Sequence, residues 1–247
     1  MVGDAGQAGE PLLVVSEVAA ALAGATPLEL PQRLCEAYQQ AMGADSVVLS
    51  LMPHTAHWHL VHATSPLARQ GEETQFTLGD GPTITASACA HPVLVPDLRT
   101  STWPLNTQFA EYLPTARTVL AIPVMLRARD LGVVTLYYTQ PRTVTENEIE
   151  HAQCAAYLAV EPLLQARETL TADGKDWPGV CARWRTVHQA IGMVTARLDC
   201  PAIDALDLLR SYSFTTGRSL PDIATILMSD HRGPEDLDDD PDCHTPA

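Results

Sequence analysis

The segment VHQAIGMVTARL, residues 187–198, places hydrogen-bonding side chains around a glycine in a stretch that reads as a helix. Its apolar residues recur at spacings of four and three, which predicts one buried stripe. Gly192 lies about 125° from the centre of that stripe, on a second face that is small and polar. Because glycine in a helix costs roughly 1 kcal/mol relative to alanine, we expect another group to approach the backbone there. Arg185, His188 and Gln189 are the side chains able to hydrogen-bond that group.

The histidines of HTAHWHLVH, residues 54–62, raise the question of a metal site. His57 and His59 share one face of the predicted strand, but His62 falls on the opposite face, and the first histidine lies in a turn. No carboxylate or cysteine is near in the sequence to complete a ligand set. We therefore expect no metal, and we interpret the histidines as surface residues beside a buried Trp58.

The composition is that of a globular protein, with 46% hydrophobic and 18% charged residues in a chain of 247. There is no run of about 18 apolar residues, so we expect no membrane-spanning helix and no membrane partner. The start MVGDAGQAGEPLLVV lacks the positive charge of a signal peptide. The six cysteines show no CxxC spacing, which argues against a zinc site or a disulfide framework. We expect a cytoplasmic protein with reduced thiols and no cofactor.

The net charge of −15 argues at first against a nucleic-acid partner. The excess of acidic residues is uneven, however: residues 1–172 hold 8 basic and 17 acidic side chains, whereas residues 178–232 hold 6 and 5. All basic residues of that second segment are arginines, which suit bidentate contacts to phosphate. They are Arg183, Arg185, Arg197, Arg210, Arg218 and Arg232.

The order of predicted elements indicates an α+β fold with an antiparallel sheet flanked by helices, followed by a three-helix bundle. A helix at PLELPQRLCEAYQQAMG precedes strands at DSVVLSLM and HWHLVHAT; after FTLGDGP come a short helix at 83–90, the strand PVLVPDL, the strand pair RTVLAIPVMLRA and LGVVTLYYT, and a long helix at about 146–170. Thr145 and Glu148 form a capping box at the start of that long helix. The second bundle helix has Pro201 in its first turn, and Ser219 caps the third.

These elements divide the chain into five segments. The linker TADGKDWPG separates the two folded parts, and the end of the chain is acidic, broken by proline and nearly free of apolar residues. The predicted segments are a flexible or partly helical N-terminus at 1–24, the α+β domain at 25–170, the linker at 171–179, the helical domain at 180–232 and a disordered acidic tail at 233–247.

Motifs in both halves resemble actinobacterial proteins that carry an N-terminal GAF domain and a C-terminal ANTAR domain. In the first half the similarity lies in FTLGDGP, HPVLVPDL, LAIPV, LGVVTLYYT and the following PRTVTENEIE. In the second half it lies in VHQAIGMV, DALDLLRSYSFTTGR and LPDIA. Together these motifs cover most of residues 28–230, and their combination is more specific than any one of them.

This resemblance implies an RNA-binding output domain that acts in transcription antitermination, governed by a sensory GAF domain. We expect no enzyme activity and no catalytic residues. The RNA would be paired hairpin loops in leader transcripts, where unstacked bases are accessible to side chains. The expected approach face surrounds Gly192, and arginines would contact phosphates. The RNA-binding residues expected on this basis are Arg183, Arg185, His188, Gln189, Gly192, Arg210 and Arg218.

The same resemblance implies a small-molecule pocket in the GAF domain, with Gly79, Asp80 and Thr83 near its mouth. The family commonly has cysteine where Thr83 stands, which weakens any thiol-based sensing there. It often has a serine cap where Pro201 stands, so capping of that helix is expected to move to Asp199 or Cys200.

A homodimer is a further expectation. The long helix carries a stripe of small residues that could pack against its own copy and set two RNA-binding bundles side by side. The alternative is that this stripe covers the domain's own sheet. The stripe consists of Ile149, Ala152, Ala156, Ala159, Leu163 and Ala166.

Three other interpretations are open at this stage. Gly192 could mark a close helix–helix contact inside the bundle without any RNA. The chain could be a small-molecule or redox sensor whose helical domain binds protein or DNA, although the apolar third helix LPDIATILM, with Asp222 exposed, is a poor groove reader. A methionine sulfoxide reductase of GAF fold would use Cys89 as nucleophile, but it needs a resolving thiol, and Cys35 and Cys154 lie in helices expected to pack on the sheet.

The acidic tail suggests a regulatory hypothesis outside the family resemblance. It holds six carboxylates at 235–242 and reaches about 15 to 20 Å by flexible-chain scaling. The tail could act as a phosphate mimic over Arg185, Arg210 or Arg218 when RNA is absent. The alternative is that it only aids solubility.

Overall fold

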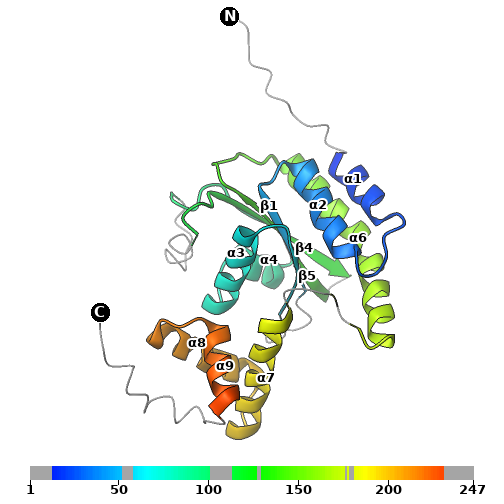
Figure 1. Ribbon diagram of the computed structural model, residues 1–247. Helices are drawn as coiled ribbons and strands as arrows, with labels where there is room; N and C mark the ends of the chain where they lie inside the picture. The colour runs from blue at the N-terminus through cyan, green and yellow to red at the C-terminus, as the bar shows by residue number, and fades with distance from the viewer. Residues whose placement is uncertain are drawn as a thin grey trace, which may run out of the picture.

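The computed structural model describes residues 13–51, 58–100, 113–126, 129–175, 177 and 181–230. Within them, a five-stranded antiparallel sheet with helices on both faces is followed by three further helices that pack on one another (Figure 1). We call the first part the sheet unit and the second, residues 181–230, the helical bundle. The first half of the predicted N-terminal segment (1–12), part of the linker, the Arg183 side chain and the acidic tail 233–247 lie outside the described residues.

The sheet has the strand order β2-β1-β5-β4-β3, and each neighbouring pair is antiparallel. Strands β1 and β4 are buried along almost their whole length because helices cover both faces of the sheet. This double coverage explains why LAIPV reads as a continuous apolar run rather than an alternation. The strands are β1 (Ser46–Leu51), β2 (His59–Ala63), β3 (Val93–Val95), β4 (Thr118–Leu126) and β5 (Arg129–Tyr138).

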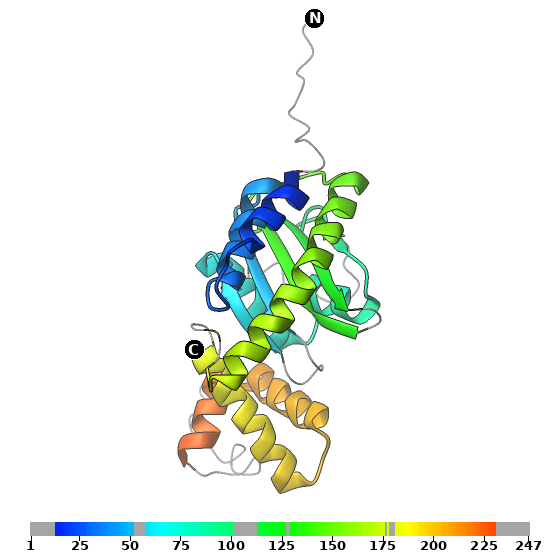
Figure 2. The ribbon, with the colours of Figure 1, turned by 90° about the vertical axis from the view of Figure 1, so that its right-hand side faces the viewer.

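Helices α1 (Leu13–Leu22), α2 (Leu30–Met42) and α6 (Glu146–Ala172) cover one face of the sheet (Figure 2). The predicted capping box at the start of α6 is confirmed: Thr145 Oγ1 accepts from the Glu148 amide, and the Glu148 carboxylate accepts from the Thr145 amide at 2.8 Å. The Tyr38 hydroxyl donates to the Ala152 carbonyl at 2.7 Å and so joins α2 to α6.

The small-residue stripe of α6 lies inside the sheet unit. Ala152, Ala156 and Ala159 are fully buried, and α6 contacts β4, α1 and α2 along this side. The alanines are small because the helix lies close to the sheet. The stripe is therefore not available to a second copy of the chain, and the prediction that it forms a dimer surface is wrong.

Helices α3 (Pro66–Leu78) and α4 (Pro82–Cys89) cover the opposite face. Helix α3 is not among the predicted helices, although Ser65 caps it, with its side chain accepting from the Ala68 amide. Polar residues on the inner side of α3 conceal the amphipathic pattern. Gly71 lets this helix approach the sheet, since a Cβ there would lie 2.5 Å from the Tyr137 ring.

The helical bundle consists of α7 (Cys181–Leu198), α8 (Ala202–Thr216) and α9 (Leu220–Asp230), at the positions predicted for the three helices. Ser219 caps α9 as expected, accepting from the Asp222 amide at 3.3 Å. The N-cap of α8 is Pro201, with no side-chain cap, so the expectation that Asp199 or Cys200 caps this helix is wrong. The buried residues that join the helices are Trp184, Val187, Ala190, Ile191, Val194, Ala205, Leu206, Leu209, Leu220, Ile223, Ala224 and Leu227.

Trp177 fixes the connection between the two parts. Its side chain is 5% exposed in the core of the sheet unit, and its indole Nε1 donates to the Pro27 carbonyl at 2.7 Å. The chain is thus anchored directly before the helical bundle begins. Among the residues that the structure describes, none of the helices combines the length and the apolar character needed to cross a bilayer.

The location of the α6 stripe predicts the effect of Ala156→Leu. Three extra carbons have no room between α6 and the sheet, so we expect this variant to lose about 1 to 3 kcal/mol of unfolding free energy. The adjacent Tyr157 is 55% exposed, and Tyr157→Ala should change stability by no more than about 0.5 kcal/mol. Urea denaturation checks both values; an Ala156→Leu variant as stable as wild type would contradict the packing described here.

Candidate functional site

The outer face of α7 is open. Gly192 is exposed, and a Cβ built on it would meet nothing within 4 Å. The alternative that Gly192 serves a close helix–helix contact is therefore wrong. Arg185 and Gln189, two of the predicted neighbours, are exposed on the same helix, whereas His188 is half-buried with its ring centroid 4.6 Å from that of His59 on β2. The predicted approach face thus consists of Arg185, Gln189 and Gly192.

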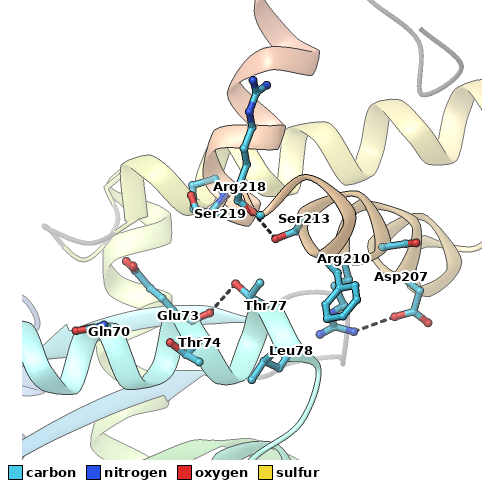
Figure 3. A pocket seen from close by; sticks show the side chains of 14 residues that line it. Gln70, Glu73, Thr74, Thr77, Leu78, Asp207, Arg210, Ser213, Arg218 and Ser219 are labelled. Atoms are coloured by element: carbon cyan, nitrogen blue, oxygen red, sulfur yellow. Dashed lines mark hydrogen bonds and ion pairs between the residues drawn. The ribbon is translucent and has the colours of Figure 1, made fainter. Parts of the chain in front are cut away.

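Arg210 lies at the junction between the helical bundle and the sheet unit. Its Nε and Nη2 donate to the Phe76 carbonyl at 3.1 and 2.9 Å, at the last turn of α3. Its Nη1 donates to Asp207 at 2.9 Å, as Figure 3 shows. Only 18% of the Arg210 side chain is exposed. The guanidinium is therefore occupied by protein groups in this arrangement and does not face solvent as a phosphate contact would.

The surroundings of Arg210 are adapted to this contact. The guanidinium lies 5.3 Å from the Phe76 ring centroid, and a Cβ on Gly79 would lie only 3.0 Å from its Cζ and Nη1 atoms. Gly79 ends α3 with a φ of +70°, a conformation that favours glycine. Removal from water lowers the pKa of Arg210, an effect that Asp207 partly offsets.

An aromatic cluster forms the apolar part of the junction. Trp58 stacks on Phe76 at a centroid distance of 4.9 Å, and Trp184 of α7 meets both rings edge-on at 4.8 and 5.0 Å. All three side chains are almost fully buried. The sheet unit and the helical bundle therefore share one continuous apolar core at this point.

A pocket of about 640 Å³ opens beside this junction, between α3 and the helices α8 and α9. Figure 3 shows Thr74 and Thr77 of α3 on one side and Ser213 and Arg210 on the other. The Arg218 carbonyl accepts from Ser213 Oγ at 2.6 Å, and the Arg218 side chain points away from α3. The lining residues are Gln70, Glu73, Thr74, Thr77, Leu78, Asp207, Arg210, Ser211, Ser213, Phe214, Gly217, Arg218, Ser219 and Pro221.

The inner side of α3 carries a buried polar network. Glu72 is 1% exposed and accepts hydrogen bonds from hydroxyl and amide groups of several elements, with no arginine or lysine among these donors. Burial is the main reason that the pKa of Glu72 is raised above its ordinary value. The donors are Ser50 (3.0 Å), Gln75 (3.2 Å), Thr83 (2.7 Å) and Tyr137 (2.9 Å).

This network occupies the region where a ligand was expected. Thr83 is fully buried, and its amide donates to the Gln75 side chain at 2.7 Å, so the prediction that it lies at a pocket mouth is wrong. Asp80 is partly exposed and accepts from the Gly81 amide at 2.7 Å. Gly79 contacts Arg210 rather than a cavity. Of the three predicted ligand-binding residues, Thr83 therefore lies in the filled interior, and Gly79 lies against Arg210 at the junction.

The cysteines are dispersed over the fold. Cys89 is exposed at the end of α4, whereas Cys35 and Cys154 belong to α2 and α6 on the other face of the sheet. Burial raises the pKa of the Cys35 thiol, which makes it a poor nucleophile. No described cysteine of the sheet unit thus shares a pocket with Cys89. Among the described residues, no three histidine, cysteine or acidic side chains gather to hold a metal ion.

The junction residues were not predicted as site residues, except Arg210. The sequence predicts a buried Trp58, and Phe76 belongs to the FTLGDGP motif of the family resemblance. One signal was present: two tryptophans and a phenylalanine in elements far apart in sequence need a common apolar environment. Which surfaces they join depends on tertiary packing.

Comparisons with known proteins concern the sheet unit. A family model for the GAF domain matches residues 24–160. One similar solved structure is the GAF domain of a phosphoenolpyruvate-protein phosphotransferase from Coxiella burnetii (15% identity, 64% of this chain and 95% of that chain covered, TM-score 0.52). Another is the GAF domain from an Acinetobacter phosphoenolpyruvate-protein phosphotransferase (13% identity, 64% of this chain and 96% of that chain covered, TM-score 0.51). A third is a free methionine-R-sulfoxide reductase from Neisseria meningitidis in complex with its substrate (14% identity, 68% of this chain and 97% of that chain covered, TM-score 0.52). At these identities the likeness concerns the fold alone. No curated protein matches the chain.

The buried carboxyl predicts a pH-dependent stability that Glu72→Gln removes. Because the pKa of Glu72 is raised in the folded chain, the folded state holds this proton more tightly than the unfolded chain does. Wild type therefore loses stability relative to Glu72→Gln as the pH rises from about 4.5 through the folded pKa, and the difference levels off above it.

Urea denaturation between about pH 4.5 and 8 measures this difference. Glu150→Gln, at an exposed carboxylate of α6, reports the general effect of removing one negative charge. If the difference between wild type and Glu72→Gln stays constant over the range, or follows that of Glu150→Gln, the carboxyl does not titrate as described.

Proposed function

The chain belongs to the GAF domain family, and on that premise we propose that it is a signal-responsive RNA-binding regulator of transcription antitermination. In this proposal the sheet unit is the sensor, and the helical bundle is an ANTAR domain that holds hairpin loops of a leader transcript. The observation that carries the proposal is the open face of α7 at Gly192. A helix-interior glycine that faces open space has no packing role in the chain, and it lowers helix stability by roughly 1 kcal/mol relative to alanine.

The side chains around Gly192 suit RNA. Arg185 and Gln189 lie seven and three residues before it, on the same exposed side of α7, and they supply a guanidinium and an amide. A guanidinium binds phosphate or stacks on a base, and an amide hydrogen-bonds base edges. Without a side chain at Gly192, a loop nucleotide can reach the helix backbone between them. Unpaired loops are the part of RNA whose bases are accessible in this way.

A DNA-binding helix-turn-helix is less well supported by the bundle. Its third helix would have to present polar side chains to the major groove. In α9, Leu220, Ile223 and Leu227 are buried against α7 and α8, and Asp222 is exposed. An exposed carboxylate at the start of this helix would repel phosphate.

The sensory part of the proposal concerns α3. GAF domains are a ligand-sensing and signalling fold. In this chain the interior behind α3 is filled by the Glu72 network, and the outer side of α3 contacts the helical bundle. A signal that rearranges the network would therefore move the helix that touches the output domain. A homodimer would place two bundles side by side for paired hairpins, through a surface other than the α6 stripe.

Substitutions at Gly192 test the proposal. Because a Cβ there meets open space, Gly192→Ala should raise the unfolding free energy by up to about 1 kcal/mol. Gly192→Leu should fold as well as wild type but bind a synthetic RNA with two unpaired hairpin loops at least about tenfold more weakly, since a lost contact of 1.4 kcal/mol has this effect. Urea denaturation and an electrophoretic mobility shift measure the two effects.

Thr169→Leu is the matched control, because it places the same side chain at an exposed position of α6. It should leave RNA affinity unchanged. Equal affinity of folded Gly192→Leu and Thr169→Leu would contradict an RNA face at Gly192.

A further inference from the structure

One face of α8 combines groups suited to unpaired nucleotides. Asp207, Arg210, Ser211 and Phe214 follow at spacings of three, one and three residues, which places them on a single side of the helix, and all four line the pocket against α3. Phe214 is 72% exposed, an unusual position for an aromatic side chain without a partner surface. A guanidinium, a hydroxyl and an open aromatic ring are the groups that bind phosphate, ribose and base of a single strand.

In this arrangement Arg210, the group on α8 best suited to bind phosphate, is bound to α3. Two guanidinium nitrogens of Arg210 bind the Phe76 carbonyl oxygen, and Asp207 holds a third. A carbonyl in the last turn of a helix carries partial negative charge; the Phe76 carbonyl accepts from the Gly79 amide at 3.3 Å and keeps a lone pair for the guanidinium. It therefore occupies the position in which Arg210 would bind a phosphate oxygen or the O6 atom of a guanine.

We propose that the Arg210–Phe214 face of α8 is a second RNA-binding surface, which α3 of the GAF domain masks by offering the Phe76 carbonyl as a substitute for RNA. This inference rests on the proposed RNA function and adds its regulation. Release of α3 exposes Arg210 beside Phe214, and the α8 face then holds an unpaired base and its phosphate.

The junction is built to open at moderate cost. The three-ring cluster stabilises the closed state, but the indole Nε1 atoms of Trp58 and Trp184 are buried with no hydrogen-bond partner among the described residues. Both N–H groups recover hydrogen bonds to water when the junction opens. The closed and open states therefore differ less in free energy than the buried ring area suggests.

The masking contact is directly connected to the interior of the sensor. Gln75 belongs to the Glu72 network, donating to Thr83 at 3.0 Å and to Tyr137 at 2.9 Å, and Phe76 is the next residue. Gln75 and Phe76 thus lie on two sides of one helical turn. A change in the network shifts the carbonyl that Arg210 holds.

The test uses variants that release Arg210 with the α8 face intact or altered. Gly79→Ala adds a Cβ 3.0 Å from the guanidinium, so the guanidinium must shift, and we expect its hydrogen bonds to the Phe76 carbonyl to weaken. Gly24→Ala is the matched control: its φ of +74° imposes the same backbone strain in the same domain, but a Cβ there meets nothing within 4 Å. Arg210→Gln removes both the guanidinium contact with the Phe76 carbonyl and the proposed phosphate contact.

Each variant of the full chain is measured without and with RNA. Amide hydrogen exchange of the last turn of α3 and tryptophan fluorescence report opening, and a mobility shift with the two-hairpin RNA reports affinity. We expect Gly79→Ala and Arg210→Gln to exchange faster and shift emission to the red relative to Gly24→Ala. Gly79→Ala should bind RNA on the order of tenfold more tightly than Gly24→Ala, because more molecules are binding-competent. Arg210→Gln should show no such gain, and Phe214→Ala should abolish the gain of Gly79→Ala.

The proposal is overturned if Gly79→Ala opens the junction without raising RNA affinity above that of Gly24→Ala. It is also overturned if Gly79→Ala still raises RNA affinity when combined with Phe214→Ala, or if neither Gly79→Ala nor Arg210→Gln changes exchange or fluorescence. Failure of the proposed function has a different signature: no variant, opened or closed, binds the RNA at all.

Discussion

The hydrogen bonds from Arg210 to the Phe76 carbonyl are the polar contact on which the arrangement of the helical bundle and the GAF domain depends. This carbonyl lies in the last turn of α3, and the Arg210 guanidinium of the helical bundle binds it through two nitrogens. An arginine buried to this degree needs several acceptors, because removing its charge from water is costly. Gly79 provides the space for the guanidinium, Asp207 provides a second acceptor, and Phe76 provides a ring for its flat face. These features make α3, together with β2, an element through which the GAF domain contacts the helical bundle.

The interior of the GAF domain also holds a buried ionisable side chain whose polar atoms need hydrogen-bond partners. A buried carboxyl at Glu72 requires hydrogen bonds from every side, and hydroxyl and amide groups of α3, α4, β1 and β5 supply them. Such a network ties α3 to the sheet with directional contacts rather than apolar packing alone. Because each member depends on the others, a change in the protonation of Glu72, or a molecule that competes for its donors, would change the hydrogen bonds that hold α3 to the sheet.

Much of the fold follows from local sequence signals, and the site follows only in part. The sheet, the capping box at Thr145 and the three bundle helices were predicted, because apolar periodicity and capping residues act over a few positions. Helix α3 was missed because Glu72 and Gln75 place polar groups on its buried side. The exposed position of Gly192 was expected from its angle to the apolar stripe. The burial of Arg210 and Thr83, and of the α6 stripe, depends on which surfaces meet, which no local pattern encodes.

In the proposed function, the α7 face and the α8 face bind RNA, and α3 regulates access to the α8 face. Hydrogen–deuterium exchange of the full chain, with and without the two-hairpin RNA, tests this most directly. If RNA binds as proposed, exchange becomes slower in α7 around Gly192 and in α8 around Arg210, and faster in the last turn of α3. Unchanged exchange in α7 and α8 at saturating RNA, or slower exchange in α3, would contradict it.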